Sequence, residues 1–198
     1  MASQSLAVVI VSWNVSEPLR HCLASLRSAL AETSLPASAW VLDNGSGDGT
    51  PEMIRSEHPW VNLIQSDDNL GFVGGNNRVI RRLLQSEGDV PTYIWLLNPD
   101  TLVHRRALDR LVDFMASHPE AGLVGPKLLN TDGSLQTCAF RFPGVIQPLF
   151  DLHLMPERLY HSRFNGRYPR EWFEQSDPFP VDHPLGAAML VRTQAIQD

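Results

Sequence analysis

Short apolar segments alternate with amphipathic segments along residues 6–124, and this alternation constrains the fold more than any other feature of the chain. Residues 6–11 (LAVVIV) are continuously apolar and rich in β-branched side chains, as in a parallel strand covered on both faces. Residues 19–30 then carry leucines at helical spacing, and Ser16 is the predicted N-cap of this helix. Further strands are predicted at 40–42, 61–64 and 93–97, and further helices beginning near 50, 76 and 108. We therefore predict an α/β fold with a mostly parallel central sheet and helices on both faces.

The composition is that of a folded globular protein. Of 198 residues, 43% are hydrophobic and 19% are charged, which is far from the disordered range. The length allows one domain with a sizeable core, or one domain and part of another. A net charge of −6 argues against a nucleic-acid-binding surface, which needs clustered basic residues. Lys127 is the single lysine, so the chain has no Gly-Lys-Ser/Thr phosphate-binding loop.

The cysteine usage and the apolar runs bear on the cellular compartment. Cys22 and Cys138 provide no disulfide framework and no metal-binding spacing, so we predict two buried, unreactive thiols in a reducing cytoplasm. The longest apolar run, at residues 6–11, is too short to span a bilayer. No basic residue precedes it, as a signal peptide would require, and we interpret it as the first strand.

Polar side chains follow the predicted strands at the points where these strands end. Asp43 opens the segment DNGSGDG after the second strand, residues 69–77 (NLGFVGGNN) follow the third, and residues 98–100 (NPD) follow the fourth. In parallel sheets the carboxyl ends of the strands meet at one edge, and ligands bind outside that edge. We therefore expect the three polar clusters to line one rim of the sheet.

Each cluster also has a simpler explanation, because Asn, Asp, Gly and Pro are the residues from which turns are made. Residues 98–101 (NPDT) are equally consistent with a plain turn. A calcium-binding loop starting at Asp43 is set aside, because glycines occupy its third and fifth positions and no glutamate occupies its twelfth. A dinucleotide fold is disfavoured, because residues 12–15 (SWNV) stand where a Gly-x-Gly-x-x-Gly turn would admit a pyrophosphate.

Asp43 and Asp100 are carboxylates at strand ends, and the residues between them include several glycines but no lysine. This arrangement suits a nucleotide-sugar site. One carboxylate accepts hydrogen bonds from the base or ribose, and the other holds a divalent cation that bridges the diphosphate. Mg²⁺ prefers few protein carboxylates together with phosphate oxygens and water, so one aspartate is sufficient. The cation stabilises the charge that grows on the leaving diphosphate.

Six short blocks of the chain follow the order of motifs in one known family. They lie at residues 7–14 (AVVIVSWN), 41–50 (VLDNGSGDGT), 69–77 (NLGFVGGNN), 96–101 (LLNPDT), 125–134 (GPKLLNTDGS) and 186–192 (GAAMLVR). Together they resemble family 2 glycosyltransferases, in particular the bacterial rhamnosyltransferase-like group. The resemblance covers nearly the whole chain, and each block has the strand or helix context that the family motif requires.

The resemblance implies the GT-A fold, in which a nucleotide-binding α/β half is joined to a more variable acceptor half. It also implies transfer with inversion at the anomeric carbon. Asp43 matches the aspartate that binds the base or ribose, and Asp100 matches the acid that holds the diphosphate and a divalent cation, Mg²⁺ or Mn²⁺. Asn98 stands in place of another acid of that motif, so the affinity for free metal is expected to be modest.

The glycine-rich segment at residues 69–78 is expected to close over the nucleotide, since its glycines permit close approach of the backbone. Arg78 is equally consistent with a base or phosphate contact and with a solvated helix arginine. The predicted nucleotide-sugar site comprises Ser12, Asn14, Asp43, Asn69, Gly71, Gly74, Gly75, Asn76, Arg78, Asn98 and Asp100, with Gly186 and Ala187 on the acceptor side and Asp100 as the metal ligand.

The character of the chain changes between residues 142 and 184, where prolines, arginines and aromatic residues replace the regular alternation. Such a stretch is typical of a long functional loop or lid. We predict a nucleotide-sugar-binding half at residues 1–142 and the start of an acceptor-binding half, incomplete, at 143–198.

The resemblance places the catalytic base in an acidic Glu-Asp motif some way beyond the Gly-Ala block. The sequence ends at Asp198 before such a motif, so the expectation is a C-terminally truncated GT-A fold whose base lies outside the 198 residues. Asp182 and His183 are the near substitutes, although the family has structural residues at both positions.

Two functional hypotheses follow. The first is an inverting, metal-assisted glycosyltransferase, with rhamnose from a deoxythymidine diphosphate donor as the leading choice of sugar and a glycan or lipid-linked molecule as acceptor. The second is a nucleotide-sugar-binding module, or inactive fragment, without transferase activity. The expected location is the cytoplasm, and a lipid-linked acceptor would place the protein at the inner face of a membrane as a peripheral protein. No nucleic-acid partner is expected.

Overall fold

The computed structural model describes residues 4–86, 88, 90–142, 152, 165–175 and 177–197. The chain forms two compact units: Met1–Val124 together with Gly186–Asp198, and Gly125–Leu185. We call them unit 1 and unit 2. The sequence predicted a nucleotide-sugar-binding half up to residue 142 and an acceptor-binding half after it. That division is defined by the ligands each half would bind, not by how the chain packs, and it stays a prediction.

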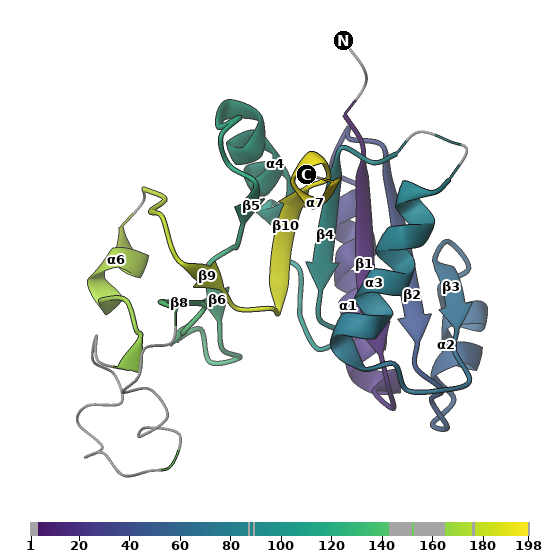
Figure 1. The fold of residues 1–198 in the computed structure, drawn as a ribbon. Coiled ribbons are helices and arrows are strands. Elements are labelled where there is room, and N and C mark those ends of the chain that lie inside the picture. Colours follow the sequence, from purple (N-terminus) through teal and green to yellow (C-terminus); the bar gives the residue numbers. More distant parts are fainter. Residues whose placement is uncertain are drawn as a thin grey trace. The chain divides into compact units, whose positions relative to one another are not determined.

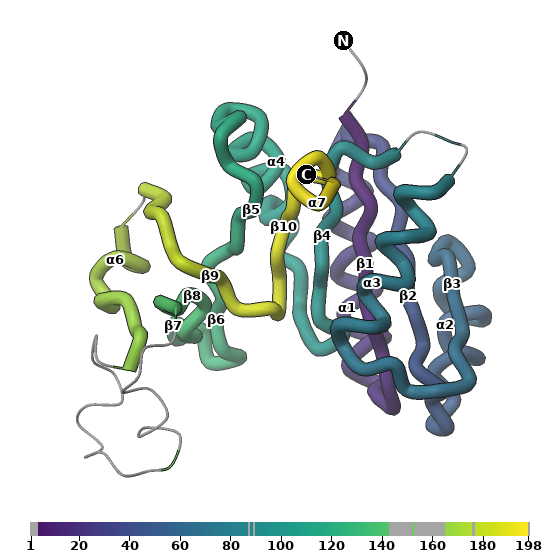
Figure 2. Tube along the Cα trace, viewed as in Figure 1, coloured from purple at the N-terminus to yellow at the C-terminus, as the bar shows by residue number. Residues whose placement is uncertain are grey.

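Unit 1 is built on a six-stranded sheet with the order β3-β2-β1-β4-β10-β5 (Figures 1 and 2). Strands β1 to β4 are parallel, and β10 runs antiparallel between β4 and β5. The strand bounds are β1 Leu6–Ser12, β2 Ala37–Asp43, β3 Asn62–Gln65, β4 Tyr93–Leu97, β5 Leu123–Val124 and β10 Ala188–Arg192. The mostly parallel central sheet predicted from the sequence is confirmed.

The apolar run at residues 6–11 lies inside the central strand, β1. This strand pairs with β2 on one side and with β4 on the other. Val8, Val9 and Ile10 are fully buried, so both faces of the strand are covered, as the unbroken run predicts. Each such side chain contributes roughly 1.5–3 kcal/mol to stability by leaving water.

Helices cover both faces of the sheet, as predicted (Figure 1). In the view of Figure 1, α1 and α2 lie behind the sheet and α3 lies in front of it. The apolar stripe of α1 is buried at Leu19, Cys22, Leu23 and Leu26, which recur at helical spacing. The helix bounds in unit 1 are α1 Ser16–Leu30, α2 Thr50–Glu57, α3 Gly71–Leu84, α4 Ala107–Ser117 and α7 Gln194–Gln197.

Two helix starts differ from the sequence prediction. α3 begins at Gly71 rather than near residue 76, because the glycine-rich run, which indicates a loop by propensity alone, packs as helix against the sheet. Ser16 is the first helical residue of α1 rather than its N-cap, and the N-cap residue provides no side-chain bond. The Ser16 backbone amide instead donates a hydrogen bond to Asp48 Oδ2 at 2.9 Å.

The described part of unit 2 consists of short strands and a helix around a small apolar cluster. Cys138, Ala139 and Phe173 are its buried members, and Phe173 packs edge to face on Phe179 with ring centres 5.2 Å apart. The bounds are β6 Leu128–Leu129, β7 Leu135–Gln136, β8 Ala139–Phe140, β9 His183–Pro184 and α6 Arg170–Glu174. Much of the loop or lid predicted between residues 142 and 184 lies outside the described residues, at 143–151, 153–164 and 176.

Candidate functional site

The carboxyl ends of the parallel strands lie at one edge of the unit 1 sheet, which we call the rim. Ser12 at the end of β1 stands opposite Asp43 at the end of β2. Ile10 stands opposite Leu97, so Asn98 leaves β4 at the same edge. Because β2 and β4 flank β1, their ends are two strand spacings, or about 10 Å, apart. The structure therefore brings the Asp43 and Asn98 clusters to one rim.

The antiparallel strand β10 begins at this rim, so the segment before it joins the same edge. The Asn98 amide donates a hydrogen bond to the Ala187 carbonyl at 2.8 Å. A Cβ atom at Gly186 would lie 3.7 Å from the ring of Phe72, near the start of α3. Gly186 and Ala187, predicted for the acceptor side, thus lie beside the residues predicted for the donor site.

Asp43 is held below the surface by three hydrogen-bond donors. Its exposed fraction is 1%. Oδ1 accepts the Ser12 hydroxyl at 3.3 Å and the Ser46 hydroxyl at 2.6 Å, and Oδ2 accepts the Ser46 amide at 2.9 Å. A carboxylate offers about four acceptor positions, so about one remains for a ligand. The carboxylate is therefore fixed in one orientation, and its contact with a base or ribose stays a prediction.

The loop after β1 (residues 13–15) and the loop after β2 (residues 44–49) are joined beside Asp43. Asn14 has a φ of 52°, in the left-handed region. Its amide donates to Ser46 Oγ at 2.9 Å, and its Oδ1 accepts the Gly47 amide at 2.8 Å. Since the Ser46 hydroxyl donates onward to Asp43, one chain of hydrogen bonds runs from the Asn14 backbone to the carboxylate. Asn14 therefore positions both loops, whether or not it contacts a ligand.

Asp48 caps the two helices that leave these loops. Its Oδ2 accepts the Ser16 amide at 2.9 Å, and its Oδ1 accepts the Thr50 amide at 3.1 Å and the Thr50 hydroxyl at 2.5 Å. Desolvation raises the pKa of the Asp48 carboxyl, but the bonds from the Thr50 hydroxyl and the two amides outweigh it, so the pKa is lowered overall. Asp48 is thus a charged anchor for α1 and α2 at neutral pH.

Asn44 ties the glycine-rich loop to the end of β2. This buried side chain accepts the Leu70 amide at 3.3 Å through Oδ1 and donates to the Gly71 carbonyl at 3.4 Å through Nδ2. Asn69 Oδ1 also accepts the Gly71 amide at 2.8 Å, and Gly71 has a φ of 67°, which favours glycine. The sequence prediction missed Asn44, Ser46 and Asp48, and their spacing after Asp43 in the DNGSGDG segment is the signal that would have found them.

Two glycines of α3 pack against protein atoms. A Cβ at Gly75 would lie 2.8 Å from Val11 Cγ1 and 3.4 Å from Leu42 Cδ2. A Cβ at Gly74 would lie 3.1 Å from Leu70 Cβ. Gly75 therefore lets α3 approach β1 and β2 closely, a role that the sequence did not predict. Contact of Gly74 and Gly75 with a nucleotide stays a prediction.

Asn76 and Arg78, the last predicted residues of this segment, differ in their surroundings. Asn76 is buried, and its Nδ2 donates to the Phe72 carbonyl at 2.8 Å within the first turns of α3. Arg78 is exposed, and its Nη1 donates to Ser66 Oγ at 3.3 Å. Asn76 thus stabilises the helix, whereas most donors of the Arg78 guanidinium remain available to a ligand.

Asp100 is exposed just beyond β4, and no side chain of the described residues pairs with its carboxylate. In the described part of the chain no three His, Cys, Asp or Glu side chains are grouped to hold a metal ion. Mg²⁺ and similar hard cations complete their coordination with phosphate and water oxygens. The Asp100 carboxylate therefore fits a cation that is shared with a diphosphate, rather than one held by protein alone.

Comparison with known proteins decides the family. The family model described as Glycosyl transferase family 2 matches residues 7–189. The chain belongs to glycosyl transferase family 2. This family 2 chain is 32% identical to the N-acetylglucosaminyl-diphospho-decaprenol L-rhamnosyltransferase of Mycobacterium tuberculosis (strain ATCC 25618 / H37Rv) over 196 residues, which are 96% of the chain and 62% of the relative. The low-salt glycan biosynthesis hexosyltransferase Agl10 of Haloferax volcanii is 25% identical over 186 residues, covering 94% of the chain and 52% of that protein.

Two solved structures share the fold of this family 2 chain. S. aureus TarS residues 1–349 in complex with UDP-GlcNAc superpose with a TM-score of 0.57 and 18% identity, over 98% of this chain and 47% of that one. The mannosyltransferase PcManGT from Pyrobaculum calidifontis, in complex with GDP-Man and Mn²⁺, gives a TM-score of 0.51 and 21% identity, over 63% of this chain and 35% of that one. The predicted GT-A fold and rhamnosyltransferase-like resemblance are thus confirmed.

Cys22 contacts the segment at residues 98–101 that follows β4. Its Sγ is 3.7 Å from the Asn98 carbonyl. Burial raises the pKa of the Cys22 thiol to about 11; hydrogen bonding with Thr101 opposes this rise, and the charge of Asp100 adds to it. Burial also raises the pKa of Cys138. Both thiols are buried, as predicted, and both are protonated at neutral pH.

Asp182 and His183, the substitutes considered for the catalytic base of the family 2 chain, have partners within unit 2. Asp182 accepts the Phe142 amide at 2.8 Å and the Tyr168 hydroxyl at 3.2 Å. The His183 ring stacks on Phe140, with ring centres 5.6 Å apart and planes 20° apart. These contacts give both residues a structural role within unit 2. A role for either residue as the catalytic base stays a prediction.

Proposed function

We propose that this family 2 protein transfers a sugar from a nucleotide-diphosphate sugar to an acceptor, with inversion at the anomeric carbon. The observation that carries the proposal is the shared rim, where Asp43, Asp100 and the Gly186–Ala187 segment come from three different strands of one sheet. Ligands of open α/β sheets bind at such strand ends. The chain spans about 62% of the length of its rhamnosyltransferase relative.

The donor nucleotide is proposed to bind on the β1–β2 side of the rim. Asp43 offers one remaining acceptor position in a fixed orientation, which suits a single hydrogen-bond donor from a base or ribose. Ser12 and Asn14 hold that orientation from the β1 side, and Asn44 holds the glycine-rich loop. Because these bonds exist before a ligand arrives, little ordering entropy opposes nucleotide binding.

A divalent cation, Mg²⁺ or Mn²⁺, is proposed to sit on Asp100 together with the diphosphate. When bound, such a cation supplies positive charge against the departing nucleoside diphosphate. The chain positions this carboxylate through Asn98, whose amide is tied to Ala187 and whose carbonyl accepts the Thr101 hydroxyl at 2.8 Å. The Mn²⁺ and GDP-Man named for PcManGT support a cation in this role.

The proposed donor sugar is rhamnose and the proposed acceptor is lipid-linked, because the mycobacterial relative is named for both. The acceptor is proposed to bind beside Gly186 and Ala187, and residues 143–198 are proposed to belong to the acceptor-binding half. Among the described residues, no helix has the length and apolar composition to cross a bilayer.

Calorimetric titration with nucleoside diphosphates and nucleotide sugars, with Mg²⁺, Mn²⁺ or EDTA, tests the proposal. Asp100→Asn should remove the metal-dependent part of donor binding, a loss of about tenfold or more, because a charge-assisted contact is worth roughly 1.5–3 kcal/mol. Asp43→Ala should weaken binding of the nucleotide whether or not metal is present. Exposed Asp113 on α4 offers a matched control, and Asp113→Asn should change neither quantity.

Thermal unfolding of each variant separates loss of function from loss of fold. Asp100 is exposed, so Asp100→Asn should keep the parent's unfolding midpoint. Donor binding by Asp100→Asn equal to the parent's would rule out the metal role. Tight, metal-dependent donor binding without product from any acceptor would favour a nucleotide-sugar-binding module over a transferase.

A further inference from the structure

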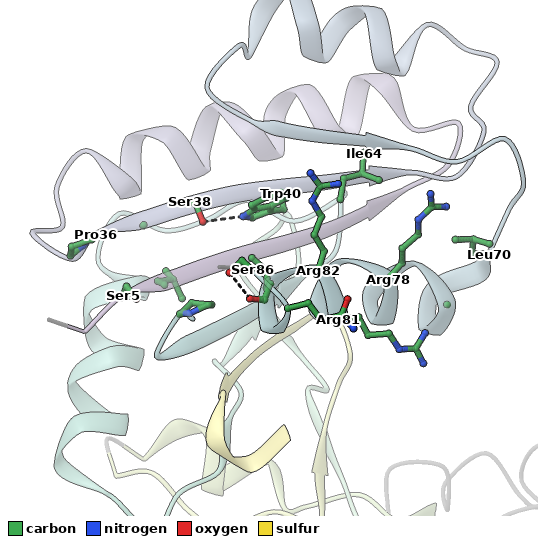
Figure 3. Close-up of a pocket in the computed structure, with 16 residues that line it drawn as sticks. Ser5, Pro36, Ser38, Trp40, Ile64, Leu70, Arg78, Arg81, Arg82 and Ser86 are labelled. Atoms are coloured by element: carbon green, nitrogen blue, oxygen red, sulfur yellow. Dashed lines mark hydrogen bonds between the residues drawn. The ribbon is translucent and has the colours of Figure 1, made fainter. Parts of the chain in front are cut away.

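A groove of about 1250 Å³ runs beside α3 within unit 1 (Figure 3). One end lies at Leu70 and Gly74, near the rim, and the other lies at Ser5 and Pro36, which precede β1 and β2. The groove is therefore mostly a feature of the sheet face, away from the strand ends that form the proposed donor site.

The floor of the groove is apolar. Trp40 of β2 and Ile64 of β3 are half-buried and project from the same face of the sheet, since Leu42, two residues after Trp40, stands opposite Ile64. Parallel strands are usually covered on both faces, so partial exposure of two large apolar side chains here is unusual. This floor offers a surface for the apolar part of a ligand.

The wall that α3 contributes to the groove is basic. Arg78, Arg81 and Arg82 line it, and no Asp or Glu appears among its described lining residues. Since the whole chain has a net charge of −6, this local excess of positive charge does not reflect general basicity. The described residues include no carboxylate partner for these three guanidinium groups, whereas other arginines are paired: Arg20 with Glu57, Arg55 with Glu52 and Arg105 with Glu32.

Two of the three arginines are directed toward the floor. Figure 3 shows Arg78 and Arg82 rising from α3 toward the strands, while Arg81 points away. The Arg82 guanidinium carbon lies 5.8 Å from the centre of the Trp40 ring, a cation–π contact that holds the side chain over the groove. The Cβ atoms of residues four apart on a helix are about 6 Å apart, so Arg78 and Arg82 leave α3 on the same face and their long side chains can turn toward one phosphate or diphosphate group.

We propose that this groove binds the phosphate group of an organic anion whose apolar part lies on Trp40 and Ile64. Guanidinium forks match phosphate oxygens, and the apolar floor beside them selects an amphiphilic ligand over inorganic phosphate. The ligand is either the headgroup region of an anionic phospholipid or a soluble organic phosphate. The proposal goes beyond sugar transfer and does not depend on it. Because Arg78 also belongs to the predicted donor site, the test uses Arg82 and Trp40.

The first experiment compares two probes that share a phosphate head. Dihexanoyl phosphatidic acid and glycerol phosphate are titrated by calorimetry in EDTA, so that metal-dependent donor binding does not contribute. The short-chain lipid should bind more tightly than glycerol phosphate, because only the lipid has an apolar part. Arg82→Gln, which keeps part of the aliphatic stem over Trp40, should weaken binding about tenfold. Arg110→Gln removes an exposed charge of α4 and should leave binding unchanged.

The second experiment identifies the source of the phosphate. Sedimentation with vesicles of phosphatidylcholine, with or without phosphatidylglycerol, shows whether the groove binds a membrane. Binding that needs phosphatidylglycerol and is lost in Arg82→Gln assigns the groove to a lipid headgroup. Binding of the short-chain lipid without vesicle binding assigns it to a soluble organic phosphate. Trp40→Ala should weaken binding of the short-chain lipid more than binding of glycerol phosphate, because it removes the apolar floor as well as the cation–π contact that positions Arg82.

Three outcomes would overturn the groove proposal: no probe binds, Arg82→Gln binds the probe as well as the parent does, or Asp43→Ala and Asp100→Asn both lose the probe. The last outcome would place the probe at the rim instead. Asp43→Ala and Asp100→Asn alter the proposed donor site only, so they should retain the probe. The proposal for the groove and the proposal for sugar transfer can therefore be tested independently of each other.

Discussion

His58, between α2 and β3, is a buried histidine whose two ring nitrogens find no hydrogen-bond partner among the described residues. Its exposed fraction is 6%. Desolvation lowers the pKa of the imidazole, and the charge of Glu57 opposes this only in part. A lowered pKa in the folded state means that the fold accepts the neutral ring and resists its protonation. His58 therefore links folding stability to pH.

The free energy of unfolding should fall as the pH falls below about 6.5, the ordinary pKa of histidine in an unfolded chain. Above that pH both states hold a neutral ring, and below it the unfolded state binds the proton more readily. His58→Phe should remove this part of the pH dependence. Urea unfolding at about pH 7.5 and about pH 5.5 measures the effect. If the free energy of unfolding declines as much in His58→Phe as in the parent, groups other than His58 cause the pH dependence. His104 is exposed, so His104→Phe serves as the control.

Ser46 links the backbone of Asn14 to the carboxylate of Asp43. Ser46→Ala removes the hydroxyl but keeps the amide bond to Asp43 Oδ2. The free energy of unfolding should fall by about 1–2 kcal/mol, and affinity for a nucleoside diphosphate in EDTA should fall with it. Calorimetry and denaturant unfolding check the two effects, with exposed Ser28→Ala on α1 as control. A variant with lower stability but unchanged affinity would contradict the positioning role.

The sequence predicted which residues would gather at the rim but not how each is held. Parallel strands bring their carboxyl ends together, so Asp43 and Asn98 are placed by topology alone. The burial of Asp43 under three donors depends on the left-handed backbone of Asn14, which lies in a separate loop and precedes α1 in the chain. Hydrogen bonds between loops are set by tertiary structure, and no residue pattern records them.

At the scale of elements, α3 departs most from the sequence prediction. Glycines at 74 and 75 indicate a loop by propensity, since glycine costs about 1 kcal/mol relative to alanine inside a helix. The packing of Gly75 against Val11 and Leu42 explains its presence, because a side chain would hold α3 away from the sheet. The strand β4, by contrast, was predicted at the bounds that the structure shows, because an unbroken apolar run with a sharp polar end is a local signal.

Gly75→Ala should destabilise unit 1, although alanine is the better helix former. The new Cβ would lie 2.8 Å from Val11 Cγ1, and a β-branched side chain in a buried strand has little room to move. Overpacking of this kind costs about 1–3 kcal/mol, which exceeds the gain in helix propensity. Denaturant unfolding measures the loss.

A double variant identifies the cause of that loss. Val11→Ala makes room for the added methyl group, so Gly75→Ala should cost less in the Val11→Ala background than in the parent. Gly47→Ala serves as the control. It should cause no overpacking, because a Cβ added there would meet no atom within 4 Å. Equal losses from Gly75→Ala in both backgrounds would show that the contact with Val11 is not the cause.

At the scale of the whole molecule, unit 1 is completed by residues that follow unit 2 in the sequence. β10 lies between β4 and β5, and its Leu190 is fully buried. The residue pattern of a five-residue strand does not reveal its partners, so the place of β10 in the sheet order could not be predicted. Without β10, the backbone groups of β4 and β5 that face it would be unpaired.

Replacing Gly125–Leu185 by about eight Gly and Ser residues should therefore leave a folded unit 1. Val124 stands opposite Leu190, so the two cut ends start a few residues apart along one antiparallel pair. At about 3.3 Å per residue the gap is about 15 Å, which such a linker spans. Circular dichroism should show cooperative thermal unfolding, and nucleotide binding at the rim should persist. A chain that ends at Leu185 lacks β10 and should show neither. If that shorter chain folds while the linked one does not, β10 is not what completes the sheet.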